Sequence, residues 1–196
     1  MYPITLDLKG KPVLIIGAGN VGERKIMSVY NAGAEITVIS EQYGEPVKKL
    51  ARDGKIRLVE RSYQPGDCRG YFMVIGSTGS NAVNAVISQE CTSLGILVNI
   101  VNQPELCNFY VPAVIKRGDF QIAVSTGAKS PALAREIRKE LEEQYGEEYG
   151  RLTHRLGVIR KELKQKYSSD PAELSRQLQI AFQEEYNKFK KGNKTD

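Results

Sequence analysis

A glycine-rich stretch near the N-terminus has the residue types and spacing of a dinucleotide-binding loop. Its glycines follow the pattern G-x-G-x-x-G, directly after the apolar run 13–16 and at the head of a helical pattern. In this motif the glycines permit a tight turn, close approach of backbone amides to a pyrophosphate, and close packing of helix on strand. The competing interpretation is an ordinary turn between strand and helix. We predict that the loop binds a dinucleotide through Gly17, Gly19, Asn20, Val21 and Gly22.

Polar residues follow three further strand-like runs. After the run 35–39 come Ser40, Glu41 and Gln42, where an acidic side chain usually accepts the ribose 2′-hydroxyl. No arginine lies there to receive a 2′-phosphate, so NAD is favoured over NADP, with a solvated loop acid as the alternative for Glu41. Thr78 and Asn102 follow two later runs, at the strand ends where a doubly wound sheet places its ligand. We expect the cofactor to contact Ser40, Glu41, Gln42 and Thr78. A plain turn is the competing interpretation around Thr78.

The elements that must position these residues alternate between strand and helix through the first half of the chain. This rhythm predicts the α/β class and a Rossmann-like, doubly wound parallel sheet. The expected strands are residues 13–16, 35–39, 56–59, 71–75 and 96–101, and the expected helices are residues 21–32, 45–52 and 80–94. We therefore assign residues 1–110 to an NAD-binding Rossmann domain.

The pattern changes after residue 110. Two strand-like runs, 110–116 and 120–125, predict a hairpin, and Ser130-Pro131 predicts the start of a helix that presents Leu133, Ile137 and Leu141. A hairpin and one helix cannot bury both faces, so we expect residues 111–146 to form a dimerisation element of a homodimer. Residues 147–196 are expected to form a helical C-terminal domain, with helices at 147–166 and 171–189 and a frayed tail at 190–196.

Composition narrows the class of protein. The 196 residues carry a net charge of +5, but the basic residues alternate with acids, which argues against a nucleic-acid partner. There is no apolar run long enough to cross a membrane and no signal-peptide pattern at the start, so we expect a cytoplasmic protein with no membrane contact. Cys68, Cys91 and Cys107 are widely spaced, which predicts reduced thiols and no metal site.

Several longer motifs make the chain similar to the precorrin-2 dehydrogenase family. Many members of that family are also sirohydrochlorin ferrochelatases, and some are fused to a methyltransferase. The resemblance rests on residues 8–13 (LKGKPV), 21–25 (VGERK), 98–101 (VNIV), 107–113 (CNFYVPA) and above all 123–135 (AVSTGAKSPALAR). It implies an N-terminal Rossmann domain, a central dimerisation element, and NAD-dependent oxidation of precorrin-2 to sirohydrochlorin in sirohaem biosynthesis.

The resemblance also implies roles for individual residues. Family members contact the cofactor at the positions of Asn20, Val21, Glu41 and Gln42. Because the tetrapyrrole substrate is rich in carboxylates, the basic residues near the matching motifs are candidates for an anion-binding rim, although each alone is also typical of an ordinary surface. These candidates are Arg24, Lys25, Lys116, Arg117, Lys129 and Arg135.

Two candidate catalytic positions differ from the family pattern. The family carries an aspartate, thought to be the base, where this chain has Asn102, and an amide cannot accept a proton near neutral pH. Thr126 matches a family serine near the active site, with a turn or capping role as the alternative. His154, the one histidine, fits a helix surface better than a proton-handling site.

The substitution at position 102 leaves alternatives open. The dehydrogenase is the first hypothesis, with ferrochelatase activity in question. The second is a catalytically reduced module that binds or delivers the tetrapyrrole on the same fold. A redox-sensing regulator of nucleic acid ranks last, because no helix-turn-helix pattern is evident.

Overall fold

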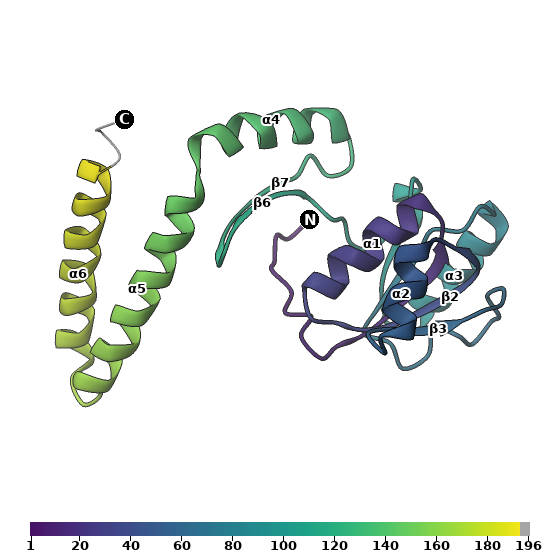
Figure 1. The fold of residues 1–196 in the computed structure, drawn as a ribbon, viewed down its shortest axis with the longest axis horizontal. Coiled ribbons are helices and arrows are strands. Elements are labelled where there is room, and N and C mark those ends of the chain that lie inside the picture. Colours follow the sequence, from purple (N-terminus) through teal and green to yellow (C-terminus); the bar gives the residue numbers. More distant parts are fainter. Residues whose placement is uncertain (193–196) are drawn as a thin grey trace. The chain divides into compact units, whose positions relative to one another are not determined.

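The structure is a computed structural model that describes residues 1–192 (Figure 1). It has two compact units, which meet in sequence at Tyr110 and Val111. The second unit includes both the segment 111–146 and the helices that follow it.

The first unit is built on a five-stranded parallel sheet in the order β3-β2-β1-β4-β5. In chain order its strands are β1 (Pro12–Ala18), β2 (Glu35–Tyr43), β3 (Arg57–Val59), β4 (Met73–Gly76) and β5 (Leu97–Ile100). Its helices are α1 (Asn20–Asn31), α2 (Glu45–Arg52), α3 (Asn81–Ser93) and the short 3-10 helix η1 (Pro104–Leu106). The predicted α/β class and doubly wound parallel sheet are therefore confirmed.

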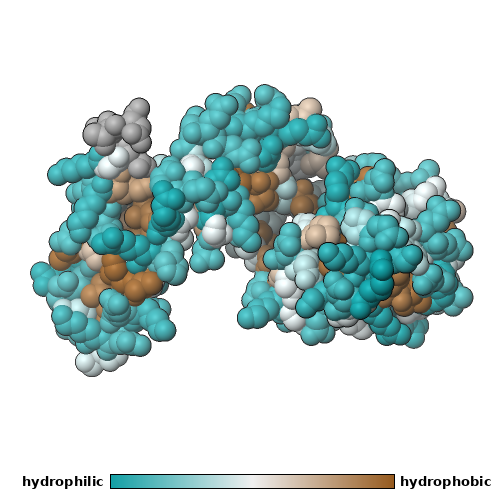
Figure 2. Space-filling model, viewed as in Figure 1, coloured by the Kyte–Doolittle hydropathy of each residue, from teal (hydrophilic) through white to brown (hydrophobic). Residues whose placement is uncertain are grey.

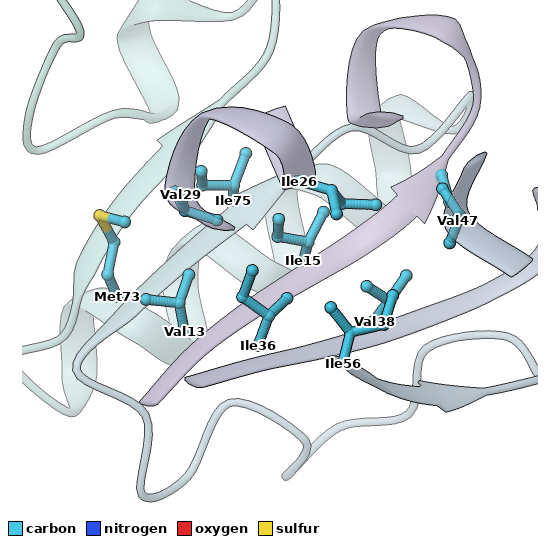
Figure 3. Close-up of a cluster of buried hydrophobic side chains, with 11 residues drawn as sticks. Val13, Ile15, Ile26, Val29, Ile36, Val38, Val47, Ile56, Met73 and Ile75 are labelled. Atoms are coloured by element: carbon cyan, nitrogen blue, oxygen red, sulfur yellow. The ribbon is translucent and has the colours of Figure 1, made fainter. Parts of the chain in front are cut away.

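Helices bury the sheet on both faces. Along β1, Val13 and Ile15 belong to one apolar cluster, and Leu14 and Ile16 belong to another. Figure 3 shows the first cluster, where α1 contributes Ile26 to the packing on Ile15. The second cluster includes buried residues of α3. A strand covered on both faces needs apolar residues throughout, which explains the uninterrupted run that predicted it.

Strand β2 differs from its predicted length. It was expected to end at residue 39 but continues to Tyr43, which pairs with Ala18 across an irregularity in the register. A bulge of this kind bends the strand. Ser40, Glu41 and Gln42 therefore belong to the strand itself, at its end beside the glycine loop.

The second unit contains the predicted hairpin and three helices. The hairpin is β6 (Ala113–Arg117) and β7 (Phe120–Val124), and the helices are α4 (Pro131–Gln144), α5 (Glu147–Lys166) and α6 (Pro171–Gly192). The chain was predicted to fray from residue 190, but α6 continues to Gly192, so this prediction is wrong for residues 190–192. The rest of the predicted tail lies outside the described residues.

Aromatic rings link the hairpin to the last helix. Phe120 of β7 stacks on Tyr149 of α5 at a centroid distance of 5.2 Å, and Tyr149 packs edge-on against Phe189 of α6 at 4.9 Å. On α4, Leu133 of the predicted apolar face is 54% exposed, whereas the neighbouring Ala134 is buried. The short Ala134 lets α4 lie close to the hairpin, which it contacts on both strands.

Within residues 1–192, no helix combines the length and apolarity needed to cross a bilayer.

Two glycines of α5 should respond to alanine in opposite directions. A Cβ at Gly150 would lie 2.6 Å from the carbonyl oxygen of Arg117, whereas a Cβ at Gly157 meets nothing within 4 Å. Gly150→Ala should lower the free energy of unfolding by about 1–3 kcal/mol through overpacking. Gly157→Ala should raise it by about 0.5–1 kcal/mol because glycine is a poor helix former. Urea unfolding of both variants checks the pair, and equal effects would contradict the close approach of α5 to β6.

Candidate functional site

The candidate site lies at the carboxyl ends of the parallel strands. From β1 the chain crosses outward to β2 and β3, whereas β4 and β5 lie on the other side of β1. Doubly wound sheets bind their ligands beside this change of direction, at the loops after the two strands that flank it, which are β1 and β4 here. Here the loops are joined by hydrogen bonds: Ser77 N–H donates to the Ile16 carbonyl at 2.8 Å and its hydroxyl to the Gly17 carbonyl at 2.6 Å.

Two glycines of the motif are required by close packing. Gly17 has φ +92°, and a Cβ there would lie 2.6 Å from the Ser77 carbonyl oxygen. A Cβ at Gly22 would lie 2.1 Å from the Gly17 carbonyl oxygen. Any larger residue at either position would push the loops apart or shift α1.

Gly19 has a different environment. A Cβ there meets nothing within 4 Å, and Gly19 occupies the N-cap of α1 with no side chain capping the helix. The first amides of α1, beginning with Asn20 and Val21, therefore face open space with the positive end of the helix dipole behind them. This arrangement fits the diphosphate of NAD, which would bind these amides.

Ser40 supports this loop from β2. Its side chain is buried, accepts a hydrogen bond from Ala18 N–H at 3.0 Å and donates to the Gln42 carbonyl at 2.7 Å. Because both contacts are internal, the hydroxyl holds the glycine loop against β2. Glu41 and Gln42 are exposed at the same strand end, so their side chains are accessible to the ribose of a bound dinucleotide.

Thr78 belongs to the loop after β4. Its hydroxyl donates to the side-chain carbonyl of Asn84 at 2.7 Å, and Ser80 caps α3 by accepting from Val83 N–H, as predicted. Asn84 is buried and was not predicted, since an asparagine within a helical pattern gives no signal of a tertiary contact. The part of Thr78 that faces the glycine loop is its backbone, whose nitrogen is 3.1 Å from the Cβ position of Gly17.

Asn102 follows β5 in a left-handed conformation, with φ 62° and an exposed side chain. Asparagine and aspartate tolerate this region better than most residues, so backbone geometry alone accounts for either type here. The next residue, Gln103, donates from its amide to the Asn81 side chain at 2.6 Å. Its amide oxygen is buried without a partner within residues 1–192.

Cys107 lies beside this loop, and Lys25 of α1 is half-buried. The Cys107 sulfur contacts the Ile100 N–H at 3.1 Å and the Gln103 carbonyl at 3.3 Å, which holds it against the backbone of the Asn102 loop. Burial raises the pKa of the Cys107 thiol and lowers the pKa of the half-buried Lys25, which is lowered further by the charge of Arg24. Neither side chain's environment could be foreseen from the sequence, because no fixed spacing relates α1 to this loop.

Five of the predicted site residues belong to the second unit. Thr126 accepts from Ser130 N–H at 3.0 Å, which is a turn-forming role. Arg117 donates to the Tyr145 carbonyl at 3.1 Å and pairs with Glu147 at 3.5 Å, so its guanidinium has internal partners. The other three side chains are exposed: Lys116, Lys129 and Arg135.

The described part of the chain offers no preformed metal centre. Within residues 1–192 there is no group of three or more histidine, cysteine, aspartate or glutamate side chains that could hold an ion. His154 is exposed on α5. The three cysteines are free.

Comparisons with known proteins agree with this geometry. Residues 4–113 match a family model described as putative NAD(P)-binding, and residues 117–144 match one described as sirohaem biosynthesis protein central. Among curated relatives, a siroheme synthase of Methylococcus capsulatus is 39% identical over 151 residues, which are 77% of this chain and 32% of that protein. A siroheme synthase of Vesicomyosocius okutanii is 35% identical over 155 residues, which are 79% of this chain and 33% of that protein. The chain thus spans about a third of the length of these relatives.

A solved structure, "SirC, precorrin-2 dehydrogenase", matches over both units. Its TM-score is 0.76 at 26% identity, and the match covers 97% of this chain and all of that one. In this chain the segment that matches the central part of sirohaem biosynthesis proteins directly follows the nucleotide-binding part. The chain therefore belongs to the putative NAD(P)-binding family.

Proposed function

We propose that this protein oxidises precorrin-2 to sirohydrochlorin with NAD, as a cytoplasmic homodimer. The observation that carries the proposal is the uncapped start of α1 beside Gly19, in a chain similar to a precorrin-2 dehydrogenase over that protein's whole length. NAD, when bound, supplies the acceptor for a hydride. The chain's own residues hold the cofactor and orient the substrate.

On this proposal the cofactor lies across the switch point of the sheet. The amides of Asn20 and Val21 bind the diphosphate, and Glu41 accepts a hydrogen bond from the adenosine ribose. The nicotinamide end is directed to the loops after β4 and β5, which carry Thr78 and Asn102. Ser40 acts through the loop that it supports.

The substrate carboxylates are proposed to bind basic side chains that lack internal partners. Arg24, Lys116, Lys129 and Arg135 are exposed and meet this condition within residues 1–192. Arg117 is a weaker candidate, because its guanidinium is already engaged by Tyr145 and Glu147. Guanidinium and ammonium groups form charge-assisted hydrogen bonds with carboxylates, which suits a polyanionic macrocycle.

The experiment is an anaerobic assay with precorrin-2 and NAD that follows NADH formation. Turnover supports the dehydrogenase. Tight precorrin-2 binding without NADH formation would instead support the delivery module, which the amide at position 102 favours.

Gly19→Asp separates cofactor binding from folding. An aspartate at the N-cap would itself accept from the first amides of α1, so the free energy of unfolding should stay unchanged or rise by about 1 kcal/mol. NAD affinity should fall roughly 10- to 100-fold, since a lost charge-assisted hydrogen bond is worth about 1.5–3 kcal/mol. Calorimetry and urea unfolding measure the two effects. Gly19→Ala, for which there is room, is the control, and undiminished NAD binding by the aspartate variant would refute the loop assignment.

Asn102→Asp tests the question of metal insertion. Pyrrole nitrogens lose protons as a metal enters, and a positioned carboxylate contributes roughly 10²–10⁴-fold to such transfers. We expect the wild type to insert Co²⁺ into sirohydrochlorin slowly and the variant to do so about 100-fold faster, as followed by the absorption spectrum. The left-handed backbone accepts aspartate, so the fold should be retained. Equal rates would show that position 102 does not limit chelation.

The proposed dimer uses the segment 111–146. In this segment α4 packs against the two-stranded sheet, and three apolar residues are exposed: Val111, Val114 and Leu133. Apolar side chains are also exposed on the C-terminal helices, as Figure 2 shows.

Leu133→Glu should convert the dimer to monomers, because burying an unpaired carboxylate in an interface is costly. Sedimentation velocity measures the change. Gln165→Glu, which adds the same charge on the exposed surface of α5, should leave the dimer intact. A monomeric wild type at micromolar concentration would exclude the assembly.

A further inference from the structure

Glu23 places a second carboxylate beside the end of β2. It lies one turn into α1, where its N–H donates to the carbonyl of Gly19 at 2.9 Å. Its side chain extends to Gly44, the residue that follows β2, because a Cβ at Gly44 would lie 2.7 Å from the Oε2 of Glu23. Side chains of a helix point back toward its N-terminus, so this carboxylate lies close to the end of α1 that carries the uncapped amides.

The carboxylate of Glu23 has no internal partner. Within residues 1–192 it forms no hydrogen bond and no ion pair, although the residue is half-buried. Two bases of the neighbouring α2, Lys48 and Arg52, are engaged by Glu45 at 3.5 and 3.1 Å. Arg24 follows Glu23 on α1, but consecutive residues of a helix do not face each other. The negative charge of Glu23 is therefore not paired with any basic side chain of the described residues.

The proposed position of the cofactor brings its adenosine ribose to this region. On the proposed function the diphosphate binds at the start of α1, and Glu41 accepts a hydrogen bond from the ribose. These two points are close together, since Ala18 of the glycine loop pairs with Tyr43 of β2. Glu41 is exposed and, like Glu23, unpaired within the described residues. A group carried by this ribose would therefore meet carboxylates from both β2 and α1.

We propose that Glu23 is a specificity-determining residue, which together with Glu41 disfavours the 2′-phosphate of NADP and so selects NAD. This role rests on the proposed function, because it requires a nucleotide at the glycine loop. A 2′-phosphate adds about two negative charges, whereas the 2′-hydroxyl of NAD can donate a hydrogen bond to a carboxylate. The matched family model is described as putative NAD(P)-binding, which covers both cofactors.

Glu23 also lies at the start of α2, whose N-cap is Gly44 with no side chain capping the helix. A carboxylate is favourable at the positive end of a helix dipole, which helps to hold Glu23 toward β2. If supporting α2 were its whole role, replacing Glu23 would weaken the binding of NAD and of NADP to the same extent. The ratio of the two affinities therefore distinguishes selection from support.

The test measures the dissociation constants of NAD and NADP by calorimetry in the wild type and in Glu23→Gln, which keeps the shape of the side chain and removes its charge. We expect the wild type to bind NAD more tightly, and Glu23→Gln to reduce the preference about 10-fold by binding NADP more tightly. Glu35→Gln removes the same charge from the opposite end of β2, where the residue is exposed, and should leave the preference unchanged. An unchanged preference in Glu23→Gln would show that Glu41 alone selects the cofactor and would overturn the proposal.

A second measurement uses the wild type and does not depend on the folding of a variant. Salt screens repulsion between partly exposed charges, so the preference for NAD should shrink as NaCl is raised from about 0.01 M to about 1 M. Glu23→Gln should show a smaller change over the same range. The same salt dependence in both proteins would contradict a contribution from Glu23.

Both measurements use nucleotide binding without precorrin-2. Equal affinities of the wild type for NAD and NADP would overturn the role of Glu23 alone, because the glycine loop would still bind a cofactor. Binding of neither nucleotide would overturn the proposed function, and the role of Glu23 with it.

Discussion

The close approach of the loops after β1 and β4 is the constraint on which the first unit depends. The Ser77 carbonyl occupies the space that a side chain at Gly17 would need, and the Gly17 carbonyl occupies the space that a side chain at Gly22 would need. These contacts bring the start of α1 to the switch point of the sheet and leave its amides uncapped. The first and third glycines thus serve packing, whereas the second keeps space open for a ligand.

Sequence patterns predicted the sheet, its helices and the glycine loop, because each depends on local periodicity. Strand β1 is an apolar run because both of its faces are covered, and Ser80 caps a helix within its own segment. The hairpin was likewise foreseen from two runs around a turn. Such features depend on residues close together in the sequence, so a sequence pattern predicts their bounds to within a few residues.

Contacts between segments distant in sequence were not predictable in the same way. Ser40 was expected to touch the cofactor, but its hydroxyl is buried between Ala18 and Gln42, because β2 continues past its expected end. Arg117 was expected to be available for the substrate, but it donates to the carbonyl of Tyr145 at the end of α4 and pairs with Glu147 at the start of α5. In each case the residue was recognised as a candidate from its type, but its contacts with a segment distant in sequence determine what its side chain binds.

The aromatic contacts of the second unit bear on when this part of the chain can fold. Phe120 in the hairpin reaches Phe189 in α6 through the ring of Tyr149. During synthesis the N-terminal sheet can therefore close before the second unit has emerged from the ribosome, since its strands and helices are all encoded before residue 111. The hairpin must wait for α6 to complete its packing, so its apolar surface stays exposed longer in the nascent chain than that of any strand in the sheet.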